Sequence, residues 1–234
     1  VVDVPNDRRM NYGELETRVC KLANAALDSM ALQPGDRVAI FSKNCIEYLE
    51  VFYACTRVGL IVQPLNWRLG VPELVKILTD AKPSVFIYST ELSAVAKQLQ
   101  PLDGVSHWLE FDNTPECSYE QMLSNAPTTL PDKVSDVGDD DPALILYTGG
   151  TTGESKGALH SHRSLFAGML NQTVAERIVA TDVYMLTGQM FHIPIGLAIN
   201  YMSHGCPLVL INFDAKLALQ VIEKERVSAF LGIT

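Results

Sequence analysis

Short apolar segments alternate with segments of helical periodicity along most of this chain. An Asn-x-x-Glu helix start at 11–14 precedes an apolar strand at 37–41, a helix at 46–58, and further strands at 60–65 and 84–88. Short connections between such segments indicate βαβ units, in which the strands run parallel and helices cover both faces of the sheet. The expected fold class is therefore α/β, with doubly wound, mainly parallel sheets flanked by helices.

One stretch interrupts this alternation. Residues 126–142 are rich in proline and aspartate, and we interpret them as a surface connection between a first α/β portion at 1–125 and a second portion at 143–234. The three aspartates at 139–141 are interpreted as part of this solvated connection, because three adjacent acids cannot face one ion without a special turn. Residues 1–9 are interpreted as the end of an element that begins upstream.

The second portion continues the same alternation. Ser161 and Asp214 are candidate N-caps for two of its helices. The apolar window at 193–213 is divided by prolines and a glycine, so it is interpreted as buried segments and not as a membrane span. The predicted helices are 163–175, 197–203 and 215–225, and the predicted strands are 143–146, 183–186, 207–211 and 227–231.

A run rich in glycine and threonine lies between the strand at 143–146 and the helix that begins near Arg163. Its sequence is Tyr147-Thr148-Gly149-Gly150-Thr151-Thr152-Gly153-Glu154-Ser155-Lys156-Gly157. Glycines let the main chain approach a ligand closely, threonine hydroxyls can turn towards phosphate oxygens, and Lys156 adds a mobile positive charge. Backbone N–H groups converge on an anion when such a loop joins a strand to a helix. We therefore predict a polyphosphate-binding loop.

Two common phosphate-binding motifs do not account for this run. A Walker A loop needs Gly-Lys followed by Ser or Thr, whereas here Ser155 precedes Lys156 and Gly157 follows it. The G-x-G-x-x-G spacing of a dinucleotide fingerprint, with its later ribose-binding acid, does not occur here either. A flexible solvent-exposed turn is the alternative, but such a turn needs neither the preceding strand nor the single lysine at its end.

The segment from Thr148 to Gly157 resembles the signature loop of the adenylate-forming (AMP-binding) superfamily, which includes acyl-CoA synthetases, peptide-synthetase adenylation domains and luciferases. The family's usual loop is Thr-Ser-Gly-Thr-Thr-Gly-x-Pro-Lys-Gly. Gly149 stands in place of its serine, which removes a hydroxyl, and Ser155 stands in place of its proline, which frees a backbone angle before the lysine. Both changes can weaken the grip on phosphate. The resemblance extends over essentially the whole chain.

A second segment resembles the next signature of the same family. Met190-Phe191-His192, with Gly196 nearby, is similar to an aromatic-His segment that in relatives lies near the substrate's carboxylate and acyl chain. The resemblance therefore assigns Phe191, His192 and Gly196 to substrate binding. On the residues alone, a buried histidine that bonds backbone at a strand end is the favoured interpretation of His192. Trp67 and Arg68 also resemble a family segment, and we assign them to core or turn packing.

The resemblance implies a reaction of two steps. A carboxylate attacks the α-phosphorus of ATP to form an acyl-adenylate, and the thiol of coenzyme A then takes the acyl group of a fatty or other apolar acid. Mg²⁺ would bridge phosphate oxygens, and no metal-ligating residue is assigned. Catalytic roles fall to Lys156, Thr151 and His192. Cofactor binding is assigned to Thr148, Gly149, Gly150, Thr151, Thr152, Gly153, Lys156 and Gly157.

Family members continue into further motifs, a ribose-binding aspartate and a mobile C-terminal domain with a catalytic lysine, and these features do not occur before Thr234. We therefore expect an incomplete N-terminal AMP-binding domain at 1–234, without the C-terminal domain and unable to complete adenylation alone. A peptide-synthetase-type adenylation domain is an alternative within the family. A non-catalytic nucleotide- or acyl-binding module is an alternative from a different class.

Composition limits the partners and the compartment. The net charge of −9 and the lack of basic runs argue against nucleic-acid binding, although an acidic protein can still bind ATP at contact range. The cysteines are scattered without a Cys-x-x-Cys pair, which favours buried thiols in a reducing cytoplasm. No signal peptide or transmembrane segment is predicted. The possibility of a homo-oligomer stays open. The five cysteines are Cys20, Cys45, Cys55, Cys117 and Cys206.

Overall fold

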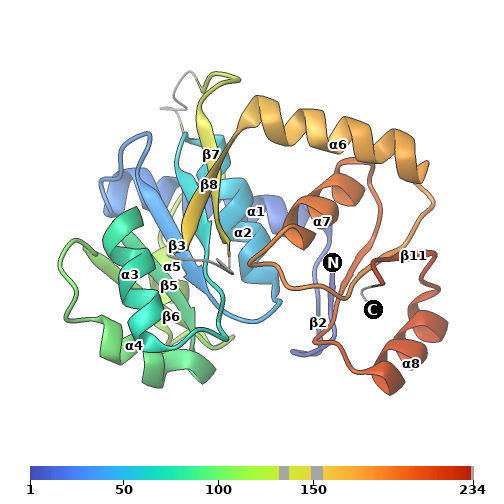
Figure 1. The fold of residues 1–234 in the computed structure, drawn as a ribbon, viewed down its shortest axis with the longest axis horizontal. Coiled ribbons are helices and arrows are strands. Elements are labelled where there is room, and N and C mark those ends of the chain that lie inside the picture. Colours follow the sequence, from blue (N-terminus) through green and yellow to red (C-terminus); the bar gives the residue numbers. More distant parts are fainter. Residues whose placement is uncertain (132–136, 149–154, 233–234) are drawn as a thin grey trace.

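Two sheets organise the computed structural model of the protein, which describes residues 1–131, 137–148 and 155–232 (Figure 1). The first sheet has the strand order β6-β5-β3-β4-β7-β8 and the second has the order β11-β9-β10-β1-β2. The strands of the first sheet are β3 (Arg37–Phe41), β4 (Ile61–Pro64), β5 (Val85–Ser89), β6 (His107–Phe111), β7 (Pro142–Thr148) and β8 (Lys156–Ser161). Those of the second are β1 (Val2–Asp3), β2 (Arg8–Arg9), β9 (Tyr184–Leu186), β10 (Leu208–Leu210) and β11 (Ala229–Phe230).

Parallel pairing dominates both sheets. In the first, β3 pairs in parallel with β4 and β5, β5 with β6, and β4 with β7. In the second, β9 pairs in parallel with β10 and β11, and β10 with β1. Antiparallel pairing occurs where β7 meets β8 and where β1 meets β2. The predicted α/β class with mainly parallel sheets is thus confirmed.

Helices cover both faces of each sheet. One face of the first sheet packs on α3 and α4, which lie on the outer side of the molecule in Figure 1, and the other face packs on α1, α2 and α5. The second sheet packs on α7 from the inner side and on α8 from the outer side. The helices are α1 (Tyr12–Asn24), α2 (Ile46–Arg57), α3 (Val71–Ala81), α4 (Ser93–Leu99), α5 (Ser118–Ser124), α6 (His162–Glu176), α7 (Pro194–Ser203) and α8 (Ala215–Glu225), with a π-helix η1 (Ala25–Ser29) and a 3-10 turn η2 (Thr90–Leu92). Within the described part of the chain, no helix combines the length and apolar character needed to cross a lipid bilayer.

Several helix starts follow directly from their capping residues. Asn11 accepts from the backbone N–H of Glu14 while the Glu14 carboxylate accepts from the N–H of Asn11, which completes a capping box. Ser161 caps α6 and Asp214 caps α8, each through its side-chain oxygen. These three predictions are confirmed, because a cap is a local interaction that three or four residues specify.

One expectation is wrong. The sequence predicts that the glycine-rich loop leads to a helix without another strand, whereas β8 follows the loop and pairs antiparallel with β7. Residues 1–9 contain the β1–β2 hairpin, and their interpretation as the end of an element that begins upstream stays a prediction. These strands carry little signal in the sequence: β8 is a largely exposed edge strand, and β1 and β2 have two residues each. The division at 126–142 stays a prediction, although β7 and β8 from the second portion join the first sheet.

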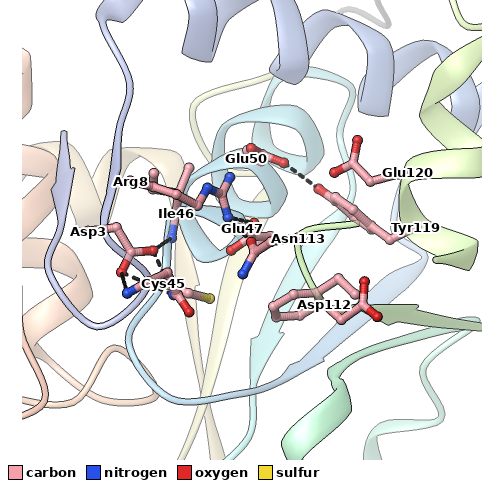
Figure 2. Close-up of polar contacts among 12 residues, drawn as sticks. Asp3, Arg8, Cys45, Ile46, Glu47, Glu50, Asp112, Asn113, Tyr119 and Glu120 are labelled. Carbon is pink, nitrogen blue, oxygen red and sulfur yellow. Dashed lines mark hydrogen bonds and ion pairs between the residues drawn. The ribbon is translucent and has the colours of Figure 1, made fainter. Parts of the chain in front are cut away.

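Buried polar groups connect the N-terminal hairpin to α2 (Figure 2). Asp3 on β1 accepts from the backbone N–H of Ile46 at 3.4 Å, and Arg8 on β2 binds the carboxylate of Glu47 at 2.5 Å. Burial raises the pKa of the Asp3 carboxyl, although hydrogen bonds from Asn6 oppose the shift. Because β1 pairs with β10, these contacts join the second sheet to the helix that covers the first.

A second buried carboxylate lies one helical turn further along α2. Glu50 is fully buried and accepts from the hydroxyl of Tyr119 at 2.7 Å, as Figure 2 shows. The guanidinium of Arg18 binds Glu50 at 2.5 Å and Glu120 at 2.5 Å, so one cation serves two acids. Burial first, and then the nearby charge of Glu47, raises the pKa of the Glu50 carboxyl. These contacts join α1, α2 and α5.

Candidate active site between the two sheets

The ends of the glycine-rich loop lie on adjacent edge strands. Thr148 ends β7 and Lys156 begins β8, and the two residues face each other in the antiparallel register. Ser155 donates a hydrogen bond to the carbonyl of Thr148 at 2.8 Å, which fixes the spacing of the two strand ends. Thr148 and Lys156 are exposed to solvent. The predicted phosphate-binding residues between them, Gly149, Gly150, Thr151, Thr152 and Gly153, lie outside the described residues.

Gly157 packs closely against its neighbours in the hairpin. A Cβ atom at this position would lie 2.7 Å from Cδ1 of Ile145 and 3.1 Å from the ring of Tyr147, so both side chains would have to shift to accommodate it. The hydroxyl of Tyr147 donates to the carboxylate of Asp80 at 2.5 Å. Burial, followed by this hydrogen bond to Asp80, raises the pKa of Tyr147. The strand that leads into the loop is therefore held against α3, which carries Asp80.

The aromatic-His segment forms the turn between β9 and α7. Met190 is fully buried, Phe191 is partly buried and His192 is exposed. The backbone N–H of His192 donates to the carbonyl of Gln189 at 3.2 Å, and its carbonyl accepts from Ile195 at 3.1 Å. The interpretation of His192 as a buried histidine is therefore wrong, because its backbone makes the turn while its side chain faces solvent.

Trp67 and Arg68 lie against this segment, which their assignment to packing did not anticipate. The indole N–H of Trp67 donates to the side-chain oxygen of Gln189 at 2.8 Å. The guanidinium carbon of Arg68 lies 4.5 Å from the centre of the Trp67 ring and 5.9 Å from that of Phe191. Their position shortly after β4 could have indicated a place at the site, since ligands of parallel sheets bind at the carboxyl ends of the strands.

An apolar cavity of about 270 Å³ lies between the loop-bearing strand and the helix that follows His192. Leu144 and Leu146 of β7 line one side, and Gly196 at the start of α7 lines another. The other lining residues come from α2, β8, α6, α7 and the N-cap position of α7: Phe52, His160, Ser164, Leu165, Gly168, Met169, Gln172, Ile193, Ile195, Leu197 and Ile199. The β7–β8 hairpin lines this cavity through Leu144, Leu146 and His160. The segment that follows His192 lines it through Ile193, Ile195 and Gly196.

A more polar cavity of about 540 Å³ lies where the carboxyl ends of both sheets meet. Lys43 follows β3, Arg68 follows β4 and Asn212 follows β10. Arg68 and Lys43 bring positive charge to this cavity, which suits an anionic group, although Lys43 is also paired with Glu91 at 2.9 Å. The remaining lining residues are Trp67, Thr187, Gly188, Gln189, Phe213, Phe230, Leu231 and Gly232.

The acidic run at 139–141 lies outside both cavities. Arg163 binds Asp139 at 3.3 Å and Asp140 at 2.8 Å, and all three side chains are mostly exposed. The run is a solvated connection, as predicted. Across residues 1–131, 137–148 and 155–232, no group of three or more His, Cys, Asp or Glu is arranged to hold a metal ion.

Comparisons with known proteins agree with this geometry. The family model described as AMP-binding enzyme matches residues 1–234. A feruloyl-CoA synthase from Amycolatopsis sp. is 32% identical over 233 residues, and the match covers 96% of this chain and 43% of that protein. The chain therefore spans less than half the length of this curated relative.

Solved structures show the same arrangement of strands and helices. The inhibitor-bound N-terminal domain of FACL13 from Mycobacterium tuberculosis superposes with a TM-score of 0.89 at 28% identity, covering 98% of this chain and 57% of that chain. ATP-bound MatB from Rhodopseudomonas palustris superposes with a TM-score of 0.85 at 27% identity, covering 99% of this chain and 45% of that chain.

Proposed function

This chain belongs to the AMP-binding enzyme family, and we propose that it acts in a ligase that activates a carboxylic acid with ATP and passes the acyl group to coenzyme A. One observation carries the proposal: the β7–β8 hairpin, whose strand ends are Thr148 and Lys156, and the segment that directly follows His192 line one apolar cavity. A nucleotide held at the hairpin and an acid held in the cavity would bring a phosphate and a carboxylate together.

The β7–β8 hairpin and the loop that it carries would bind the phosphates of ATP. Lys156 would pair with phosphate oxygens, an interaction worth on the order of 4 kcal/mol at ~4 Å in a half-screened site. The hydroxyls of Thr148, Thr151 and Thr152 and the backbone N–H groups at Gly149, Gly150 and Gly153 would donate to the same oxygens, where charge accumulates as pyrophosphate leaves. Magnesium would accompany ATP and supply positive charge that offsets the charge of its phosphates.

The apolar cavity would bind the carboxylic acid. Its walls are mostly aliphatic, which favours a fatty or other apolar acid, and its volume of about 270 Å³ is near the lower end of the range for ligand pockets. Gly196 borders the cavity where α7 begins, and Phe191 and His192 precede that helix. We assign these three residues to the carboxylate end of the acid. The relative from Amycolatopsis sp. is, by its name, a feruloyl-CoA synthase.

Two further parts of the proposal concern the protein as a whole. We propose that the 234 residues do not complete adenylation alone, which pyrophosphate exchange would test: acid-dependent exchange comparable to that of a full-length relative would contradict it. We also propose a cytoplasmic location, which the five buried, free thiols support.

Replacing Lys156 by alanine tests the nucleotide side. Both Lys156 and Lys97 are exposed, and Lys97 lies on α4, so Lys97→Ala is a matched control. We expect Lys156→Ala to weaken binding of a non-hydrolysable ATP analogue to the chain at least tenfold, equivalent to ~1.4 kcal/mol. Titration calorimetry would measure both variants. Equal affinities of the Lys156→Ala and Lys97→Ala variants for the analogue would show that the hairpin does not bind the nucleotide.

Two alternatives give different results in the full-length ligase. A non-catalytic nucleotide-binding module would show some loss of affinity in Lys156→Ala but no acid-dependent ATP consumption in the wild type. A peptide-synthetase-type adenylation domain would consume ATP in the presence of an amino acid and transfer the product to a carrier protein instead of coenzyme A. Measuring both acceptors in parallel separates these cases.

A further inference from the structure

A single buried side chain connects the first sheet to the aromatic-His segment. Asn44 lies between β3 and α2, and only 2% of its surface is exposed. Its Nδ2 donates to the carbonyl of Gly188 at 2.7 Å and to the carbonyl of Ile211 at 3.2 Å. Its Oδ1 accepts from the backbone N–H of Met190 at 2.9 Å. Each of these hydrogen bonds joins the segment after β3 of the first sheet to a segment that follows a strand of the second sheet.

Asn44 lies beside the topological switch point of the second sheet. The chain passes from β9 to its neighbour β10 and then to β11 on the other side of β9. The crevice at such a reversal, here between the carboxyl ends of β9 and β11, is where open α/β sheets commonly bind ligands. Gly188 follows β9 and Ile211 follows β10, so Asn44 holds the β9 side of this crevice and joins it to the end of β10.

The three hydrogen bonds determine where the next residues lie. The backbone is held at Gly188 and at Met190, while the intervening Gln189 side chain is held by Trp67. Phe191 and His192 follow immediately. We propose that Asn44 is a positioning residue that holds Phe191 and His192 directly before Ile193, where this segment begins to line the apolar cavity, an inference that rests on the proposed function of that site.

The chemistry of the side chain explains why an amide is needed. An asparagine offers two N–H donors and one carbonyl acceptor, which match two backbone carbonyls and one backbone N–H. An aspartate has the same shape but, when ionised, offers no donor. In Asn44→Asp the carboxylate would face the carbonyls of Gly188 and Ile211, and the segment would move away. When protonated, the carboxyl regains one donor.

Trp67 provides a local reporter of this displacement. The chain contains two tryptophans, and the indole N–H of Trp67 bonds Gln189, whereas Trp108 lies on β6. A ¹⁵N NMR spectrum of the chain would separate their indole signals, with Trp67→Phe as the assignment. Asn24→Asp is a matched control, because buried Asn24 also donates to backbone carbonyls, but to those of Cys20, Pro127 and Thr129, away from the site.

We expect the Trp67 indole signal to shift in Asn44→Asp at pH 7 and to return towards its wild-type position as the pH is lowered. It should not shift in Asn24→Asp, and the Trp108 signal should stay unchanged in both. A Trp67 signal that is unchanged in Asn44→Asp, or that shifts equally in the control, would overturn the inference. Should Asn44→Asp not fold, Asn44→Ser retains a hydroxyl and answers the same question, because its lost carbonyl contacts still predict a Trp67 shift.

Kinetics of the full-length ligase test the link to function. We expect Asn44→Asp to lower kcat/KM for the acid at least tenfold with the KM for ATP unchanged, and Asn24→Asp to keep wild-type values. A wild-type protein without acid-dependent ATP consumption would overturn the proposed function while leaving the NMR result intact. An active wild type together with unaltered acid kinetics in Asn44→Asp would overturn the positioning role.

Discussion

Replacing Arg18 by methionine should destabilise the protein far more than its position near the surface suggests. The guanidinium Nε lies 2.5 Å from one carboxylate oxygen of Glu50, and a second nitrogen lies 3.1 Å from the other. Arg18 retains 21% exposure, whereas the Glu50 side chain has none. Methionine preserves most of the length of the side chain but leaves Glu50 buried without a counter-charge.

The expected loss can be estimated from these contacts. Removing one partner of a buried ion pair costs about 3–5 kcal/mol, and we take about 3 kcal/mol because the hydroxyl of Tyr119 still donates to Glu50. For a chain of this size, a loss of that magnitude lowers Tm by roughly 6–12 °C. Glu50→Gln removes the charge itself and should be milder, since the amide can still bond Tyr119.

The loss should depend on pH in a defined direction. Burial and the charge of Glu47 raise the pKa of Glu50 in the folded state, so the folded protein holds this proton where the unfolded chain has lost it. The resulting contribution to stability is fully present below the unfolded value of about 4.3 and is lost as the pH rises through the folded pKa. Removing Arg18 raises that pKa further. The deficit of Arg18→Met should therefore be smaller at pH 5 than at pH 8.

Urea unfolding followed by circular dichroism at pH 5 and pH 8 would measure this effect. The variants form a double-mutant cycle of Arg18→Met, Glu50→Gln and both together. The double variant should be more stable than the sum of the single losses predicts, and its deficit should change less with pH. Acidic neighbours Asp3, Glu47 and Glu120 are common to all four proteins. A deficit for Arg18→Met that is the same at both pH values, with additive losses, would refute the reasoning.

Two glycines give further predictions. In Gly188→Ala the added Cβ would lie 2.5 Å from Cγ of Pro194, a rigid ring, so we expect a loss of about 1–3 kcal/mol and a lower Tm by differential scanning calorimetry; an unchanged Tm would show that the turn adapts. In Gly168→Met the new side chain enters open space in the apolar cavity. We expect a gain of roughly 0.5–1 kcal/mol from helix propensity together with weaker binding of bulky acids, and an unaltered acid preference in direct binding assays would contradict the assigned cavity.

Local signals predicted much of the fold. The helix α8 was predicted at 215–225, which are its observed bounds, because Asp214 caps its start and an apolar face continues to its end. The buried strand at 37–41 was likewise found at its predicted position, since strands buried on both faces appear as continuous apolar runs. The edge strand β8 was missed because only Ala158 and Leu159 are apolar within it, and Leu159 is exposed.

The candidate site was predicted less completely, and the reason is separation along the chain. The loop and the segment with Phe191 and His192 are contiguous patterns that a resemblance can identify. Trp67 contacts Gln189 across 122 positions, and Asn44 contacts Gly188 across 144. No periodicity or capping rule connects residues so far apart. What could have singled them out is their place directly after β3 and β4, which becomes informative only when both strands are known to be parallel neighbours.

Because ligands bind at the carboxyl ends of parallel strands, the polar cavity depends on both sheets. Lys43 and Arg68 follow strands of the first sheet, and Gly188 and Asn212 follow strands of the second, yet all four line one cavity. Each sheet alone presents only one wall at its carboxyl edge, and the other wall depends on how the sheets pack. That packing is fixed by α2, which is buried along most of its length, and by Asn44, which lies just before the N-cap of α2. A change that shifts the second sheet relative to α2 should therefore distort the polar cavity without altering any of the residues that line it.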